Sequence, residues 1–168
     1  MLIFDWTGCN NDRKSSSGYI IKLFGNTVIW STRKQQSVSL SSAEAEYIAL
    51  SQASCEIRWI QQILQEMGLN KDKQPSIVYE DNKSCINIAN NAMNPKRLKH
   101  IDIRFHHVKD LIEKKYIYLE YIPTEQQQAD ILTKPLPKDV FLKLKKAGGL
   151  EVNFPYSELF FNNTALHM

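Results

Sequence analysis

Three carboxylates in this sequence lie where a metal-dependent reaction on a phosphodiester would need them. Glu46 lies near the start of a long helical stretch, Asp81 directly follows an apolar run at 77–79, and Asp130 lies on a late helical segment. In layered α/β folds, ligands gather at the ends of strands, so an Asp just past a buried strand is a candidate metal ligand. Clustered carboxylates repel one another unless cations lie between them, and Mg²⁺ prefers such oxygen ligands. Two ions about 4 Å apart can activate a water and stabilise the leaving oxygen when a phosphodiester is cleaved.

Each of these acids also has a structural interpretation, and the residues alone leave both interpretations open. Asp81 could cap the helix that begins near it. Glu46 could be an acid of the first helical turn, favoured by the helix dipole. The neighbouring Glu44 follows Ser41 by three residues, which is the spacing of a capping box, so we interpret it as a cap and not as a ligand. Asp130 taken alone indicates little.

A run of basic residues between positions 95 and 115 is a candidate contact surface for a polyanion. An apolar face at helical spacing turns most of its charges outwards, where they could hold a phosphate backbone or simply be solvated. The candidate nucleic-acid-binding residues are Arg33 and Lys34, after a predicted hairpin, and Lys96, Arg97, Lys99 and Arg104 within the run. Such contacts position a duplex without reading its sequence. The histidines of the run lack a Cys pair at ligand spacing and do not indicate zinc.

The composition is that of one soluble globular domain. The chain has 168 residues, of which 43% are hydrophobic and 23% charged, and this balance argues against disorder. A net charge of +3 permits a polyanionic partner without requiring one. No apolar run reaches the roughly 18 residues of a membrane span, and the first residues lack the pattern of a signal peptide. With three cysteines and no CxxC spacing, we expect an intracellular protein, cytoplasmic or nuclear, that is not secreted.

The predicted elements alternate between strands and helices, which indicates an α/β domain with a mixed sheet. Strands at 18–24 and 27–32 form a hairpin whose connection, Gly25-Asn26, suits a type II′ turn. A long helix at 43–67 ends at Gly68, a typical left-handed C-cap. We then expect a strand at 76–79, a helix from 81 or 82 to 90, a helix from 98, a strand at 116–122, a helical segment at 125–133 and a helix at 138–147. The domain covers 1–150, residues 151–168 form a tail of unknown role, and the four apolar residues at the start are too few for a full strand.

Seven short stretches, in order along the chain, resemble the ribonuclease H region of copia-type retrotransposon polyproteins. They are Asp12-Arg13-Lys14-Ser15, Gly18-Tyr19, Ser41-Ser42-Ala43-Glu44-Ala45-Glu46-Tyr47, Tyr79-Glu80-Asp81-Asn82, Lys99-His100-Ile101-Asp102-Ile103-Arg104-Phe105-His106, Tyr121-Ile122-Pro123-Thr124-Glu125 and Ala129-Asp130-Ile131-Leu132-Thr133-Lys134-Pro135-Leu136. Together they are far more specific than any single motif. The chain is therefore similar to the ribonuclease H domain of an LTR retrotransposon Pol polyprotein.

The resemblance implies a ribonuclease H-like fold, in which a mixed five-stranded sheet is flanked by helices. It also implies hydrolysis of the RNA strand of an RNA–DNA hybrid during reverse transcription, with two Mg²⁺ ions or Mn²⁺ in their place. The reverse transcriptase domain of the same polyprotein would be a partner. By the matching motifs, Glu46, Asp81 and Asp130 would be the catalytic metal ligands.

One motif departs from the family pattern. Copia-type sequences carry Asp-x-Asp-Trp in the first strand, and the first of these acids is a fourth metal ligand; aligned on Asp5-Trp6, that position is Ile3. Asp5 lies about 6–7 Å further along the strand, a large displacement beside metal–oxygen bonds of about 2 Å, so it replaces the lost ligand poorly. We therefore expect an N-terminally truncated first strand and weak or absent cleavage. The alternatives are a non-catalytic nucleic-acid-binding module and a fragment that does not fold.

Overall fold

A single mixed sheet forms the centre of the molecule. The computed structural model describes residues 2–5, 14–70, 74–90 and 102–150, with the backbone alone for 2–5 and 102. The strands are β1 (Leu2–Asp5), β2 (Ser16–Leu23), β3 (Asn26–Lys34), β4 (Ser76–Glu80) and β5 (Ile117–Tyr121), in the order β3-β2-β1-β4-β5. The pairs that join β1, β2 and β3 are antiparallel, and those that join β1, β4 and β5 are parallel. The predicted five-stranded mixed sheet is confirmed.

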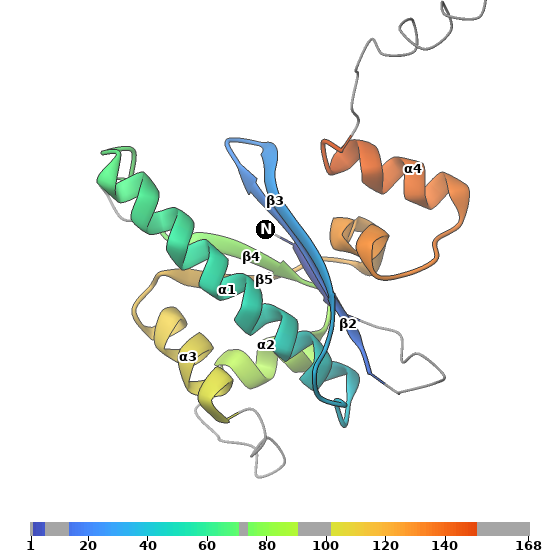
Figure 1. Ribbon diagram of the computed structural model, residues 1–168, viewed down its shortest axis with the longest axis horizontal. Helices are drawn as coiled ribbons and strands as arrows, with labels where there is room; N and C mark the ends of the chain where they lie inside the picture. The colour runs from blue at the N-terminus through green and yellow to red at the C-terminus, as the bar shows by residue number, and fades with distance from the viewer. Residues whose placement is uncertain (1, 6–13, 71–73, 91–101, 151–168) are drawn as a thin grey trace, which may run out of the picture.

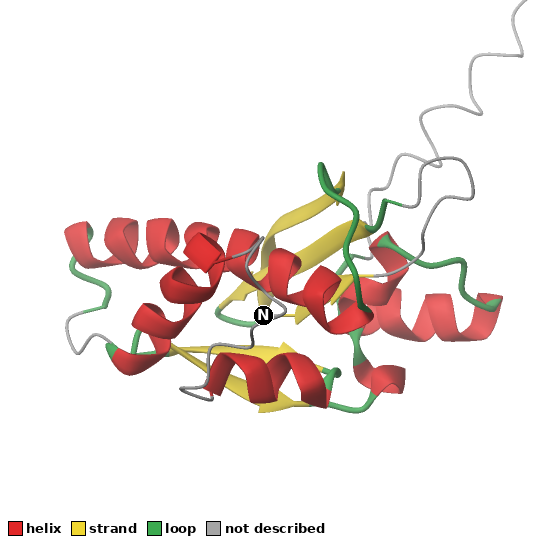
Figure 2. Ribbon diagram, turned by 90° about the horizontal axis from the view of Figure 1, so that it is seen from below, coloured by secondary structure: helices red, strands yellow, loops and turns green. Residues whose placement is uncertain are grey.

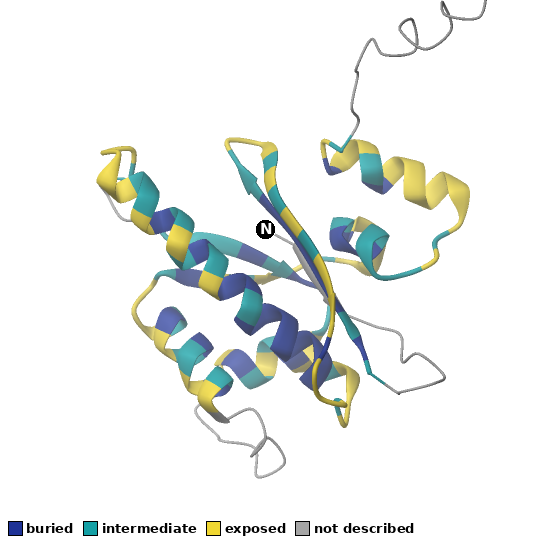
Figure 3. Cartoon of the chain, viewed as in Figure 1, coloured by how far each residue is buried: buried dark blue, intermediate teal, exposed yellow. Residues whose placement is uncertain are grey.

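Helices cover both faces of this sheet (Figure 1, Figure 2). One face carries α1 (Ser42–Glu66), α2 (Lys83–Asn90) and α3 (Asp102–Glu113), and the other carries the 3₁₀ helix η3 (Gln128–Leu132) and α4 (Lys138–Ala147). The buried residues of α1 line the side that faces the sheet (Figure 3). In β2, Tyr19 and Ile21 belong to the core under α1, whereas Ile20 packs with Ala129 of η3. Both faces of β2 are thus buried.

The strand β1 is short, yet it lies at the centre of the sheet. Its four residues pair with β2 from Leu2 opposite Ile20 to Asp5 opposite Ser17. On its other side, Leu2 pairs in parallel with Tyr79 of β4. Four residues are therefore enough to join the antiparallel half of the sheet to the parallel half, where the sequence had suggested only a stub. This register also places position 3 of the backbone beside position 80.

The hairpin that joins β2 to β3 turns one residue earlier than predicted. Leu23 pairs with Asn26, so the two-residue loop is Phe24-Gly25, and the predicted Gly25-Asn26 loop is wrong. Both loop residues have positive φ, 51° at Phe24 and 84° at Gly25. Positive φ at both positions is the signature of a type I′ turn, whose twist matches that of the paired strands.

The ends of α1 follow the prediction closely. The Ser41 hydroxyl accepts a hydrogen bond from the backbone N–H of Glu44 at 3.1 Å, and Glu44 Oε2 accepts one from the N–H of Leu40 at 2.8 Å. This reciprocal arrangement confirms Glu44 as a capping residue. At the other end Gly68 has a φ of 73°, the left-handed conformation expected after a helix.

Two helical segments of the second half of the chain differ from the prediction. The predicted helical segment at 125–133 is two 3₁₀ turns, η2 (Thr124–Gln126) and η3, and in the described part of the chain α3 begins at Asp102. The start expected for this helix at 98 and the tail at 151–168 lie outside the described residues. None of the helices within the described ranges combines the length and apolar character that a membrane-spanning helix needs.

Gly18 sets how closely η3 approaches β2. A Cβ atom at this position would lie 2.6 Å from Cγ2 of Thr133 and 3.2 Å from Cβ of Leu132. The first distance is far below van der Waals contact, and the contacted atoms belong to short side chains or lie next to the backbone. The segment that carries Asp130 is therefore seated on β2 only because this residue has no side chain.

Gly18→Ala is expected to lower the free energy of unfolding by about 1–3 kcal/mol, because the added methyl group overpacks the contact between β2 and η3. Chemical denaturation monitored by circular dichroism measures this change. An unchanged midpoint and slope would mean that η3 moves away from β2 at no cost.

Candidate active site

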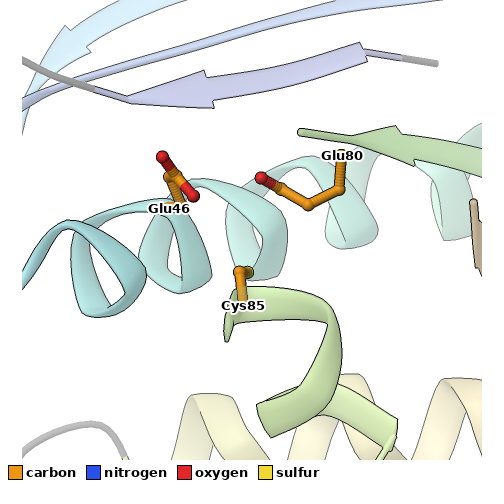
Figure 4. A group of neighbouring side chains, drawn as sticks. All are labelled: Glu46, Glu80 and Cys85. Carbon is orange, nitrogen blue, oxygen red and sulfur yellow. The ribbon is translucent and has the colours of Figure 1, made fainter. Parts of the chain in front are cut away.

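Two carboxyl groups face each other in the interior between the sheet and α1. Glu46 projects from the second turn of α1 and is 4% exposed, and Glu80, the last residue of β4, is fully buried. One ligand atom from each of Glu46, Glu80 and Cys85 lies within 4.8 Å of the others. Figure 4 shows the carboxyl groups of Glu46 and Glu80 pointing toward one another, with the Cys85 side chain of α2 beside them. The sequence analysis selected Glu46 but missed Glu80.

Burial and mutual repulsion both act against the charged forms of this pair. Two full negative charges within 4.8 Å repel by about 3–4 kcal/mol or more at an effective dielectric constant near 20. Burial, and after it the neighbouring Glu46, raises the pKa of Glu80 well above its usual value of 4.5. Burial and the same two carboxylates raise the pKa of the Cys85 thiol. Cys85 is therefore a protonated thiol and not a thiolate ligand.

Three successive residues at the end of β4 have three different roles. Glu80 Oε1 accepts a hydrogen bond from the N–H of Asn82 at 3.0 Å. Asn82 Oδ1 accepts hydrogen bonds from the N–H groups of Ser84 and Cys85 at 2.9 and 3.2 Å, so Asn82 is the residue that caps α2. Asp81 Oδ2 instead accepts a hydrogen bond from the Thr124 hydroxyl at 2.7 Å. The capping interpretation of Asp81 is wrong, which leaves this carboxylate available for another role.

Asp130 belongs to η3, which packs on the face of the sheet opposite α1. It lies in η3, is only 3% exposed, and its Oδ2 is 3.4 Å from Nζ of Lys134. Burial raises the pKa of Asp130 to about 6, against the opposing effect of the Lys134 ammonium group. Lys134 thus places a positive charge beside this carboxylate.

An open cavity of about 510 Å³ joins these residues. Its lining residues are Glu46, Asp81, Asn82, Lys83, Ser84, Tyr121, Thr124 and Lys134. The structure therefore brings two of the three predicted carboxylates, Glu46 and Asp81, to one cavity, and Lys134 connects the third to it. Lys83 adds a second cation, with its Nζ 4.6 Å from the centre of the Tyr121 ring.

The donor set fits a hard divalent cation. Glu80 Oε2, Asp81 Oδ1 and Asp130 Oδ1 are buried oxygens that receive no hydrogen bond within the described part of the chain. Such oxygens are costly to leave unsatisfied, and carboxylate oxygens are the ligands that Mg²⁺ and Mn²⁺ prefer. None of these three oxygens would have to give up a hydrogen bond within the described residues in order to bind a cation.

The predicted basic residues do not line this cavity in the described structure. Arg33 and Lys34 are exposed at the end of the edge strand β3, and Arg104 is partly exposed in the first turn of α3. Lys96, Arg97 and Lys99 lie outside the described residues. Lys83 and Lys134, which the sequence analysis did not select, are the cations that line the cavity among the described residues.

The two described cysteines differ from each other in their surroundings. Cys85 is buried, and Cys55 is exposed on α1 with its Sγ 3.5 Å from Nε2 of His107. Burial, followed by the charge of Glu56, raises the pKa of the Cys55 thiol. Cys55 is therefore not an activated nucleophile.

Curated Pol polyproteins of plant transposons match most of this chain. The chain is 36% identical over 149 residues to the retrovirus-related Pol polyprotein from transposon TNT 1-94 of Nicotiana tabacum, covering 89% of this chain and 11% of the relative. It is 35% identical over 137 residues to the corresponding polyprotein from transposon RE1 of Arabidopsis thaliana, covering 82% and 9%. The chain belongs to the retrovirus-related Pol family of transposons. It spans about a tenth of the length of these curated relatives. No protein-family model matches it.

Solved structures of ribonuclease H domains share the fold of this chain. The N-terminal ribonuclease H domain of a Mycobacterium tuberculosis protein superposes with a TM-score of 0.55 at 13% identity, covering 87% of this chain and 94% of that one. A ribonuclease H1 isolated from compost, solved in complex with an RNA/DNA hybrid, gives a TM-score of 0.52 at 20% identity, covering 78% and 91%. The fold of this Pol-family domain is that of ribonuclease H, as the sequence motifs predicted.

The raised pKa values of Glu80 and Asp130 predict how the stability of the metal-free domain depends on pH. A carboxyl group whose pKa is raised on folding binds its proton more tightly in the folded state. Its stabilising contribution is present below the unfolded pKa and is lost as pH rises through the folded pKa. The free energy of unfolding in the presence of EDTA should therefore fall as pH rises, from about 4 to about 6 for Asp130 and upwards from about 4.5 for Glu80.

The variant Glu80→Gln isolates the contribution of one group. Because glutamine does not ionise, this variant should become progressively more stable than the parent as pH rises above about 4.5. Glu120→Gln, at an exposed position on the neighbouring strand β5, is the matched control and should differ from the parent by a constant amount. Urea unfolding across this pH range measures the differences. A pH-independent difference for Glu80→Gln would contradict the raised pKa.

Proposed function

We propose that this domain hydrolyses the RNA strand of an RNA–DNA hybrid in a reaction that depends on divalent cations. The observation that carries the proposal is the arrangement of Glu46 and Asp81 in one cavity, beside Asp130, where buried oxygens of Asp81 and Asp130 accept no hydrogen bond from the described residues. Membership of the Pol family and the ribonuclease H fold support it. The compost ribonuclease H1 with a similar fold was solved with such a hybrid.

The residues of the cavity divide the work between them. Glu46, Asp81 and Asp130 would hold the cations, Mg²⁺ or Mn²⁺. When bound, these ions would supply Lewis acidity that stabilises the negative charge developing at the scissile phosphate. Thr124 orients the Asp81 carboxylate through its hydroxyl, and the rigid start of α2 fixes the end of β4 through Asn82. Lys83 and Lys134 balance the charge of the carboxylates and attract the phosphate backbone.

The remaining cations would extend the contact with the duplex. We include Arg33, Lys34, Lys96, Arg97, Lys99 and Arg104 as phosphate contacts, which position a hybrid without reading its sequence. In the parent element, the reverse transcriptase domain of the same polyprotein would deliver the hybrid. Recognition would rest on the shape of the hybrid and on the 2′-hydroxyl groups of its RNA strand.

The residue at position 3 of β1 is expected to lower the rate of hybrid cleavage. Position 3 of β1 is isoleucine, where related copia-type sequences carry a carboxylate ligand. Loss of the carboxylate from this position weakens cation binding, so cleavage should be slow.

Cleavage of a labelled RNA–DNA hybrid by the purified chain tests the proposal. Mg²⁺-dependent cutting should be weak in the parent, at least 100-fold lower in Asp81→Asn, and at least tenfold faster in Ile3→Asp, because the first change removes a ligand and the second adds one. Asp110→Asn, at an exposed acid of α3, is the control and should behave like the parent. Full activity in Asp81→Asn would refute the site. Hybrid binding with no cutting by the parent or by Ile3→Asp would identify a non-catalytic binding module.

Hybrid binding in the presence of EDTA tests the role of Lys83 separately from catalysis. Lys83→Gln should weaken binding several-fold and reduce the slope of log Kd against log salt by about 1, because one phosphate contact is lost. Lys114→Gln removes an exposed lysine that is paired with Asp110 on α3, and should leave both quantities unchanged. Equal effects of the two substitutions would indicate general electrostatics in place of a defined contact.

A further inference from the structure

We propose that Glu80 is itself a ligand of the divalent cation, so that β4 supplies the carboxylate that β1 lacks. The inference rests on the proposed function and concerns a buried residue next to Glu46, which lines the cavity. It adds a fourth ligand to Glu46, Asp81 and Asp130, at a position that the sequence motifs leave without a role.

The surroundings of Glu80 indicate a missing positive partner. Its side chain is fully buried, and Oε2 receives no hydrogen bond from any residue in the ranges the structure describes. The same carboxyl group points toward Glu46, whose nearest ligand atom lies within 4.8 Å (Figure 4). A fully buried acid facing another acid is a costly arrangement for a purely structural residue. A hydrogen bond between the two carboxyl groups reduces that cost in the metal-free domain, and a divalent cation between them would take over that role.

The second oxygen of Glu80 is already held in place. Oε1 accepts the N–H of Asn82 at 3.0 Å, and Asn82 is fixed in turn because its side chain caps α2. Metal ligands in proteins are typically oriented in this way, by a hydrogen bond to the atom that does not coordinate. The carboxyl group of Glu80 therefore has a defined direction, toward Glu46, which itself lines the cavity.

The strand register explains why this position can stand in for position 3. Leu2 pairs in parallel with Tyr79, so the next residues along each strand, 3 and 80, are neighbours across the sheet. Adjacent strands lie about 4.8 Å apart. The longer side chain of a glutamate can span much of that separation, which the displaced Asp5, two residues further along β1, cannot do.

The neighbouring residues Cys85 and Glu120 are not suited to replace Glu80 as a metal ligand. Cys85 is close enough, but its thiol stays protonated and sulfur is a poor ligand for Mg²⁺. Glu120 lies beside Tyr79 in the register of β4 and β5, is exposed, and lines a different cavity of about 640 Å³. It therefore serves as a matched control for the same substitution.

Binding of Mn²⁺ to the full chain, measured by the electron paramagnetic resonance signal of the free ion, tests the inference without any need for catalysis. The parent should bind Mn²⁺, and Glu80→Gln should raise Kd at least tenfold, as Asp81→Asn should. Glu120→Gln should leave Kd unchanged. Adding Ile3→Asp to Glu80→Gln should restore most of the affinity, because a carboxylate then returns at the neighbouring position. Glu80→Asp, which keeps the charge but shortens the side chain by one methylene, should raise Kd to an intermediate extent and serves if the glutamine variant does not fold.

The outcomes separate this inference from the proposed function. Parent-like affinity in Glu80→Gln, together with loss of affinity in Asp81→Asn, would overturn the role of Glu80 and leave the nuclease site intact. No Mn²⁺ binding by the folded parent would overturn both proposals. Tighter Mn²⁺ binding after Glu80→Gln would also overturn the inference. It would show that Glu80 does not bind the ion and only disturbs the position of the Glu46 carboxylate.

Discussion

Two buried carboxyl groups lie within 4.8 Å of each other, and the charge state of the interior depends on them. Glu46 and Glu80 are placed by different elements, a helix and a strand end, and both side chains are buried between α1 and the sheet. Their negative charges must be balanced by protons or by cations. The N–H of Asn82 holds one oxygen of Glu80, and Lys134 balances the charge of the nearby Asp130.

Hydrogen bonds describe the local shape of the chain after β4. Successive residues of the step from Glu80 to Asn82 point into the interior, toward Thr124, and back onto the first turn of α2. A strand that continued would alternate its side chains between only two faces. By ending at Glu80 and beginning a capped helix at Lys83, the chain presents two carboxylates from adjacent residues to the same region.

Most of the architecture could be predicted from the sequence because local patterns determined it. The capping box at Ser41 and Glu44, the left-handed Gly68 and the helical period of α3 depend on residues close in sequence. The turn at Phe24 could not be read in this way, since a non-glycine residue with positive φ is not favoured by its own side chain, and the register of the whole hairpin fixes it. The sheet position of β1 depends on pairing with β2 and β4, which no local pattern contains.

Among the site residues, Glu46 and Asp81 could be predicted from motifs, whereas Glu80 was missed for a physical reason that can now be stated. The sequence analysis ended the strand at Tyr79 and treated the next residues as a helix start. The buried Val78 shares its face with Glu80, because side chains two apart in a strand point the same way. That alternation was the available signal. The distance between Glu80 and Glu46 was not readable, because it depends on how α1 packs across the sheet.

The attachment of the C-terminal segment has a consequence for biosynthesis. All five strands precede Asp130 in the chain, and η3 and α4 are tied to the β2–β3 hairpin by contacts with residues more than 90 positions earlier, from Thr32 to the Leu132 carbonyl and from Lys22 to the Ala147 carbonyl. On the ribosome, the sheet and α1 are complete in sequence before these contacts can form. A nascent chain therefore gathers Glu46, Glu80 and Asp81 first and receives Asp130 last. The order of translation keeps this group of carboxylates incomplete until the end of the domain has emerged.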